Sequence, residues 1–281
     1  MIDAHVSLPV GTTAHSTRKP VTPAALLAAL PQPVEGIVLV GEGPQNLEAG
    51  WLSGSGSLLP CPVARIVPVM MAAPDAADDL AVRLDRPGIV GICDAPVQAG
   101  AGTWPASDTH RLESAAFRAT AEAASRLGIG LDLTISSFQA EAAARLARDL
   151  PELRLVINHC CHPVRDGREA RALWRDGLER LAEWPNVAVK LCDPTASEAA
   201  GPRDWLLDVL AVCLDIFGPS RTLYGSGWPA APMAPAKWAG VVGEAMGNLH
   251  PAAQARVWSG TAGALYFDGP RPALHPAPQA G

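Results

Sequence analysis

The side chains best suited to chemistry in this sequence are His5, His159 and Lys190, which lie within or directly after apolar, β-branched segments. Imidazole titrates near neutral pH and can act as a general acid or base or polarise a carbonyl group. The alternative for the two histidines is a structural, hydrogen-bonded pair. Because an unpaired lysine is rarely tolerated inside a buried segment, Lys190 either stabilises developing negative charge or forms a structural salt bridge with Asp132 or Asp193.

A second group of residues at the ends of similar segments could shape a small-molecule pocket. The predicted substrate-binding residues are Ser7, Cys93, Asp94, Thr134, Cys192, Ser226 and Trp228. Asp94 adds negative charge and would favour a neutral or cationic substrate if it faces the pocket. Asp132 and Thr134 alternate along one extended segment, so they should share a face, with Asp132 buried more deeply. A structural role is favoured for Asp132.

The sequence Cys160-Cys161-His162 suggests a Cys/His nucleophile. We prefer to interpret the two cysteines as packing thiols, because neighbouring side chains on an extended segment point to opposite sides. The six cysteines show no CxxC spacing, which indicates reduced thiols and argues against a zinc finger. Trp51 and Trp104 lie in Gly- and Pro-rich stretches and would either roof a site or cover its rim.

Charge and hydropathy exclude several classes of protein. The chain of 281 residues carries a net charge of -6, which argues against a nucleic-acid partner. It has no apolar run long enough to cross a membrane and no basic leader, so we expect a cytoplasmic protein with a small-molecule substrate. A homodimer remains a hypothesis.

The elements that must position these residues alternate in type along the chain. Eight predicted strands span 2–6, 36–40, 64–70, 89–93, 129–135, 153–159, 187–192 and 221–226, and predicted helices span 108–128, 137–149, 168–184 and 202–217, with a further helix beginning at Thr22 and Pro23. Such βα units predict a single-domain α/β protein, a (β/α)8 TIM barrel over residues 1–267. The alternative is an open doubly wound sheet, although no GxGxxG follows the first strand. We expect the Pro-rich segment 268–281 to be a flexible tail.

Several motifs fall at the ends of these strands in a recognisable order. Residues 3–7, DAHVS, resemble the DxHxH opening of the amidohydrolase superfamily, and 88–92 resemble its G-(V/I)-x-G-(I/V) strand. Residues 158–163, NHCCHP, are similar to (D/N)-H-x-G-x-P, and 186–192, NVAVKLC, to N-V-x-V-K-(L)-S. RTLYGSGWP at 221–229 is similar to a motif ending G-S-D-W-P. The chain therefore resembles the amidohydrolase-related, lactonase-like group that includes sugar-acid lactonases and 2-pyrone-4,6-dicarboxylate lactonase.

The departures from that family predict a degenerate active site. The resemblance implies that two histidines of DxHxH, the sixth-strand histidine and the eighth-strand aspartate bind a divalent cation or, in metal-free lactonases, hold the carbonyl and activate water. Here Ser7 and Gly227 replace two of the four. Since a catalytic metal site needs about three protein ligands, we expect no metal cofactor, with zinc disfavoured. Cys93 stands where relatives often carry a carboxylate-binding arginine, so the substrate is expected to lack that carboxylate.

The resemblance and the departures together imply a metal-independent amidohydrolase-like enzyme acting on a small cyclic carbonyl compound, by hydrolysis of a lactone, lactam or imine. His5 and His159 would handle protons or polarise the carbonyl, with Lys190 nearby, and Asp94 or Asp193 could orient water. Two alternatives stay open: an isomerase, cyclase or decarboxylase on the same barrel, and a catalytically inactive barrel that binds a ligand.

Overall fold

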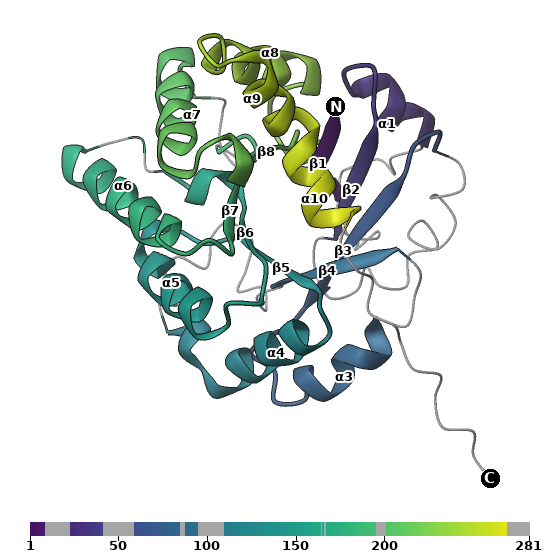
Figure 1. The fold of residues 1–281 in the computed structure, drawn as a ribbon, viewed down its shortest axis with the longest axis vertical. Helices are drawn as coiled ribbons and strands as arrows, with labels where there is room; N and C mark the ends of the chain where they lie inside the picture. Colours follow the sequence, from purple (N-terminus) through teal and green to yellow (C-terminus); the bar gives the residue numbers. More distant parts are fainter. Residues whose placement is uncertain are drawn as a thin grey trace, which may run out of the picture.

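Eight parallel strands form one sheet in which each strand pairs with the next along the chain. The computed structural model describes residues 1–8, 23–41, 59–84, 88–94, 110–163, 165, 167–194 and 201–268. The strands are β1 Ile2–Leu8, β2 Gly36–Gly41, β3 Val63–Val69, β4 Ile89–Asp94, β5 Gly130–Leu133, β6 Leu155–Ile157, β7 Val187–Leu191 and β8 Thr222–Tyr224. Their order is sequential from β1 to β8, and the sheet curls into a nearly closed barrel (Figure 1).

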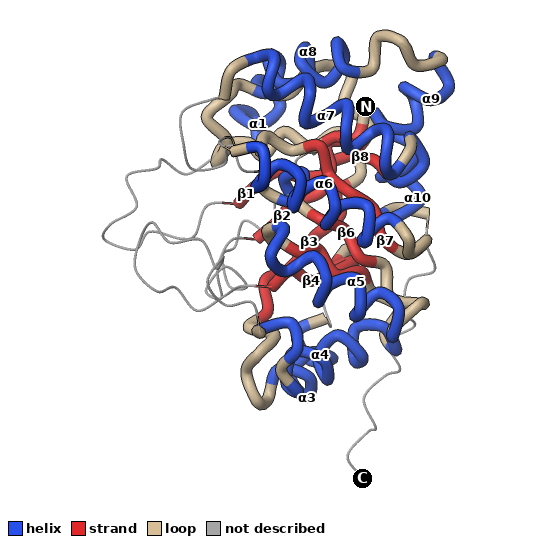
Figure 2. Tube along the Cα trace, turned by 90° about the vertical axis from the view of Figure 1, so that its left-hand side faces the viewer, coloured by secondary structure: helices blue, strands red, loops and turns tan. Residues whose placement is uncertain are grey.

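Helices surround the strands (Figures 1 and 2). They are α1 Pro23–Ala29, α3 Ala76–Arg83, α4 Ala115–Arg126, α5 Ala140–Asp149, α6 Arg168–Ala182, α7 Arg203–Phe217, α8 Pro235–Ala245, α9 Pro251–Ala255 and α10 Thr261–Tyr266, with short helical turns η4 Arg111–Glu113, η5 Ser137–Gln139, η6 His159–Cys161, η7 Pro219–Arg221 and η8 Arg256–Gly260. The arrangement is a single-domain (β/α)8 barrel, as the sequence predicted. None of the helices in the described part of the chain is long and apolar enough to cross a membrane.

Two predicted boundaries are corrected. The helix expected over 108–128 is interrupted at Ser114, whose extended backbone ends η4 and whose side chain accepts a hydrogen bond from Phe117 N at the start of α4. The strand expected over 153–159 ends at Ile157, because the chain then enters a left-handed turn. Helices α3, α8, α9 and α10 were not predicted. Trp51, Trp104 and the segment 269–281 lie outside the described residues.

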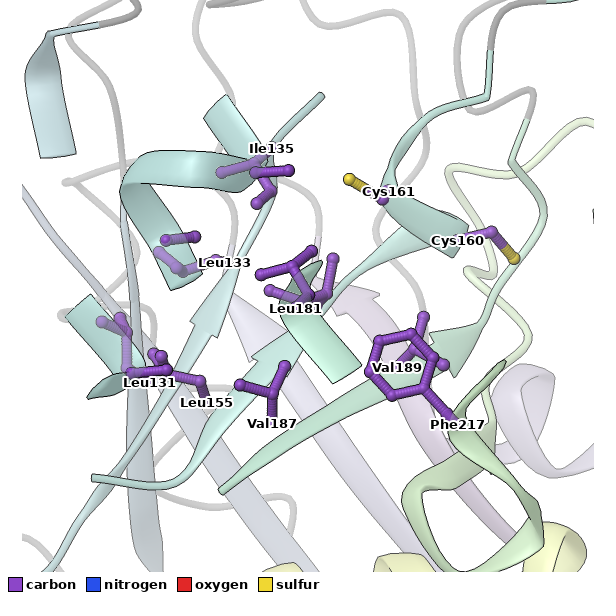
Figure 3. Packing of buried hydrophobic residues seen from close by; sticks show 14 of the residues in the cluster. Leu131, Leu133, Ile135, Leu155, Cys160, Cys161, Leu181, Val187, Val189 and Phe217 are labelled. Carbon is purple, nitrogen blue, oxygen red and sulfur yellow. The ribbon is translucent and has the colours of Figure 1, made fainter. Parts of the chain in front are cut away.

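The hydrophobic core has two main layers, as expected when both faces of a parallel sheet are covered. The outer layer lies between the strands and the helix ring. Figure 3 shows part of it: side chains of β5, β6 and β7 pack against Leu181 of α6 and Phe217 of α7. The inner layer fills the barrel with small and branched side chains, among them Ile2, Ala64 and Val156.

Helix α10 belongs to the inner layer, although it comes last in the chain. Its residues Ala262 and Tyr266 are buried in the barrel cluster. Arg154, which directly precedes β6, donates hydrogen bonds to the backbone carbonyls of Leu265 and Gly128. Since these contacts lie where strands begin, α10 closes the amino-terminal end of the barrel. The opposite, carboxyl-terminal end is where barrel enzymes place their active sites.

Candidate active site

His5 is held at the seam where β1 meets the segment after β8. The Oδ1 atom of Asp3 accepts hydrogen bonds from His5 N at 3.1 Å and from Ser226 N at 2.9 Å. Gly227 N donates to His5 O at 2.8 Å. At Gly225, a Cβ atom would lie 2.7 Å from His5 Cβ, so glycine permits this close approach. The seam therefore fixes the position of the His5 backbone and Cβ atom.

His159 approaches His5 from the end of β6. The centroids of the two imidazole rings are 4.8 Å apart, and the ring planes meet at 61°. Asn158, just before His159, donates from Nδ2 to Thr134 Oγ1 at 3.1 Å and so ties this turn to β5. His5 is 4% exposed and His159 is 9% exposed. The sequence-predicted pair is thus brought into contact, with little access to solvent.

Burial and a nearby positive charge keep both imidazoles neutral. Burial is the main cause that lowers the pKa of His5 well below its usual value, and the charge of Lys190 adds to it. The same two causes lower the pKa of His159 to about 4. The His159 ring donates a hydrogen bond to the Asp193 backbone carbonyl, which acts weakly in the opposite direction. Within the described residues, Nδ1 of His5 and Nδ1 of His159 are buried and lack a hydrogen-bond partner.

Lys190 forms the salt bridge that was one of its two predicted alternatives. Its Nζ atom pairs with Asp132 Oδ2, and both side chains are fully buried inside the barrel. Tyr266 of α10 donates from its hydroxyl to Asp132 Oδ1 at 3.0 Å. Asp132 is indeed buried more deeply than Thr134, which is partly exposed. Lys190 reaches the site through its charge, which disfavours protonation of both His5 and His159.

The predicted residues after β7 and β8 gather around His5. Ser226 is buried and its Oγ accepts from Trp228 N at 3.1 Å. Cys192 lies on the same side, since its Sγ atom and His5 both approach Gly225. Ser7 N donates to Trp228 O at 2.8 Å. The Trp228 ring packs partly against the apolar cluster between β1, β2 and α1.

The two predicted residues at the end of β4 have structural contacts. The Cys93 thiol donates to Gly41 O at 3.4 Å. Asp94 pairs with Arg111 of η4 at 2.7 Å, and both side chains are nearly inaccessible. Asp94 was expected to favour a neutral or cationic substrate if it faced the pocket. It pairs with Arg111 instead, which compensates its charge.

The segment after His159 differs from the expected extended conformation. His159, Cys160, Cys161 and His162 all have positive φ angles, between 44° and 59°. The sulfur atoms of Cys160 and Cys161 still point apart, each into packed surroundings (Figure 3). Burial raises the pKa of Cys161, and the pKa of Cys160 is raised by Cys213 and by burial. These thiols pack as the sequence suggested.

His162 is the residue at this site that sequence reasoning did not select. Its ring centroid lies 5.0 Å from that of His159. The only available signal was a histidine three residues after His159, which points to the same side only in a tight helical turn. An extended interpretation of residues 159–162 hid that relation.

The barrel places a histidine of β1 against a histidine that follows β6, and comparison with known proteins gives the family. Residues 2–267 match the family described as Amidohydrolase. The chain belongs to this family of hydrolases.

The chain aligns with its curated relatives over less than half of their length. An L-fucono-1,5-lactonase from Burkholderia ambifaria is 36% identical over 111 residues, which cover 38% of this chain and 37% of that protein. Among solved structures, an amidohydrolase from Burkholderia multivorans with bound zinc has a TM-score of 0.80 at 20% identity, covering 94% of this chain and 98% of that chain. A probable 2-pyrone-4,6-dicarboxylic acid hydrolase from Acinetobacter baumannii with bound citric acid has a TM-score of 0.72 at 14% identity, covering 94% and 98%. At these identities the solved structures show the fold.

Proposed function

We propose that this protein hydrolyses a small lactone without a metal ion, using His5 and His159 as its proton-transfer groups. The observation that carries the proposal is the contact between two neutral imidazoles, 4.8 Å apart, whose Nδ1 atoms are buried and unpartnered among the described residues. The match to an L-fucono-1,5-lactonase supports a lactone as the substrate class.

The side chains at this site do not fit a catalytic metal. Of the four ligand positions in the family pattern, His5 and His159 match two, and Ser7 and Gly227 occupy the other two. No group of three or more His, Cys, Asp or Glu side chains in the described ranges is arranged to hold a metal ion. Catalytic zinc sites use three protein ligands. We therefore assign the chemistry to the imidazoles alone.

The reaction needs a base for water and an acid for the leaving oxygen. One unprotonated Nδ1 accepts a proton as water attacks the lactone carbonyl. The ring C–O bond then breaks, and the imidazole that took up this proton returns it to the alkoxide leaving group, which gives a hydroxy acid and restores the neutral ring. Because His159 donates through its other nitrogen to Asp193, its Nδ1 carries the lone pair that a base requires. Ser7 and Ser226 border His5, and we assign substrate contacts to them and to Thr134.

The test is an assay of hydrolysis on a panel of five- and six-membered sugar lactones, with and without a chelator. Hydrolysis is measured as the release of protons. We expect activity that chelation leaves unchanged. His159→Asn should reduce kcat/KM by roughly 10²- to 10⁴-fold, with the melting temperature kept, and His5→Asn should reduce it less.

The pH profile provides a second readout of the same assignment. A base must be neutral to act, and the pKa of His159 is about 4, so the rate should fall on the acid side near pH 4 rather than near 6.5. Full turnover by a folded His159→Asn variant would remove this residue from the mechanism. Zinc-dependent activity would contradict the metal-free assignment.

A further inference from the structure

Thr134 presents a hydroxyl group at the carboxyl-terminal mouth of the barrel. It directly follows β5, and its chain neighbours Leu133 and Ile135 belong to the outer hydrophobic layer, part of which Figure 3 shows. Because side chains alternate along an extended segment, Thr134 faces the barrel interior, as Asp132 does two residues earlier. Thr134 is partly exposed, whereas Asp132 is fully buried. A substrate in the mouth can therefore reach the Thr134 side chain.

Asn158 holds this hydroxyl group in place. The pairing of β5 with β6 continues beyond the two strands, since Asn158 N donates to Leu133 O at 2.8 Å. The Nδ2 atom of Asn158 then donates to Thr134 Oγ1 at 3.1 Å. Asn158 directly precedes His159 in the chain, and its side chain lies within hydrogen-bonding reach of the His5 ring. Asn158 thus connects Thr134 to both imidazoles.

The hydroxyl proton of Thr134 has no acceptor among the described residues. A threonine hydroxyl has one proton and two acceptor lone pairs, and the hydrogen bond from Asn158 uses one of the lone pairs. The buried threonines Thr120, Thr222 and Thr261 differ, because each donates its hydroxyl proton to a backbone carbonyl oxygen. Of these four threonines, Thr134 keeps its proton for a ligand.

Lactone hydrolysis creates a need for such a donor. As water attacks, the carbonyl oxygen becomes an oxyanion until the ring C–O bond breaks, and donors that are oriented in advance stabilise its charge. The ammonium group of Lys190 is paired with Asp132 inside the barrel. The Ser226 hydroxyl donates to His5 O at 3.5 Å and accepts from Trp228 N at 3.1 Å. Both groups are therefore engaged elsewhere.

We propose that the Thr134 hydroxyl donates the hydrogen bond that stabilises the oxyanion, with Asn158 holding it in position. The inference rests on the proposed lactonase function. Thr134 keeps its proton throughout: when the ring C–O bond breaks, the electron pair of the oxyanion re-forms the carbonyl, and the alkoxide takes its proton from an imidazole. Thr134 is thus a catalytic residue, and Asn158 is a positioning residue.

Thr134→Val tests this role, because valine keeps the shape of threonine and removes the hydroxyl group. The variant should lower kcat on the lactone panel by roughly 10²- to 10³-fold, with KM little changed, and Thr134→Ser should recover most of the loss. Thr222→Val is the matched control, since Thr222 begins β8 at the opposite end of the barrel, and its kcat should equal that of wild type. An unchanged kcat in Thr134→Val, a loss that serine does not repair, or a larger loss in Ser7→Ala would overturn the assignment.

Binding of two ring compounds separates the donor role from a structural effect and from turnover. A six-membered cyclic phosphonate carries a negative oxygen on a tetrahedral centre, as the intermediate does, whereas the corresponding lactam is neutral and planar at its carbonyl. In calorimetry, Thr134→Val should weaken binding of the phosphonate about tenfold or more and binding of the lactam much less. Equal losses would show that Thr134 only shapes the site.

The same comparison keeps the two proposals distinguishable. If wild-type protein binds the phosphonate but hydrolyses no lactone, the proposed function fails, and the binding of the two compounds still decides the role of Thr134. If wild-type protein does neither, both proposals are wrong. Thr134→Ala replaces Thr134→Val in each measurement if the melting temperature shows that the valine variant does not fold.

Discussion

At the scale of single residues, Gly227 is a position that departs from the family motifs and has a local structural reason. Gly227 stands where the family has aspartate, and its φ is +67°. A Cβ atom there would lie 3.2 Å from Ala231 Cβ. The backbone, and not only the lost carboxylate, has therefore adapted to glycine.

This conformation predicts that Gly227→Asp will not restore a family-like rate. The substitution should destabilise the fold by about 1–2 kcal/mol, because a side chain enters the left-handed region. It also places a carboxylate in a site that operates without one. Gly227→Ala is the control for strain without charge. Thermal melting and kcat/KM for both variants provide the test, and much faster lactone hydrolysis by Gly227→Asp would contradict the divergent mechanism.

At the scale of elements, the barrel interior is joined by a polar network from three of them. Lys190 of β7 and Asp132 of β5 form a fully buried ion pair, and Tyr266 of α10 donates to the same carboxylate. The network links the helix that closes one end of the barrel to the charge that affects the histidines at the other. After burial, the charge of Lys190 in this network is the largest cause that lowers the pKa values of His5 and His159.

Replacing one partner of the Lys190–Asp132 pair should destabilise the fold more than replacing both. Lys190→Met alone leaves a buried carboxylate and Asp132→Leu alone leaves a buried ammonium, each destabilising by about 3–5 kcal/mol. The double variant should be more stable than either single variant, because no charge is left uncompensated. Urea unfolding of the four proteins measures the coupling energy. If the two single losses simply add, the two groups do not act as a pair.

At the scale of the whole molecule, the buried site links folding to pH. The pKa of His159 is about 4 in the folded chain against 6.5 for an ordinary histidine, so the unfolded chain binds this proton first. Stability from His159 is complete above pH 6.5 and is lost as the pH falls toward 4. Asp3 acts in the opposite direction, since burial raises its pKa from 3.8 to about 6. Its contribution is complete below pH 3.8 and is lost as the pH rises through 6.

The net prediction is acid destabilisation between pH 6.5 and 5, because the pKa values of three clustered histidines are lowered and, within the described part of the chain, the carboxyl of Asp3 alone opposes them. The full shift of His159 corresponds to about 3 kcal/mol. Melting temperatures measured from pH 7 to 5 should fall less steeply for His159→Asn than for wild type, and more steeply for Asp3→Asn. Parallel curves for all three proteins would show that the site does not contribute.

The sequence by itself determined the barrel, the order of its strands and the placement of His5 in the first strand and of His159 after the sixth. These follow from local patterns: alternating βα units and apolar runs bounded by turn residues. Tertiary structure decided which groups pair. From the sequence, Lys190 could bind Asp132 or Asp193, and Asp94 could face the pocket or not. Packing between elements settles such choices, since Lys190 pairs with Asp132 and Asp94 with Arg111. It also decided that His162 lies beside His159. That contact depends on a left-handed turn of four non-glycine residues, which local propensity disfavours and to which Trp174 of α6 donates a hydrogen bond at Cys160 O.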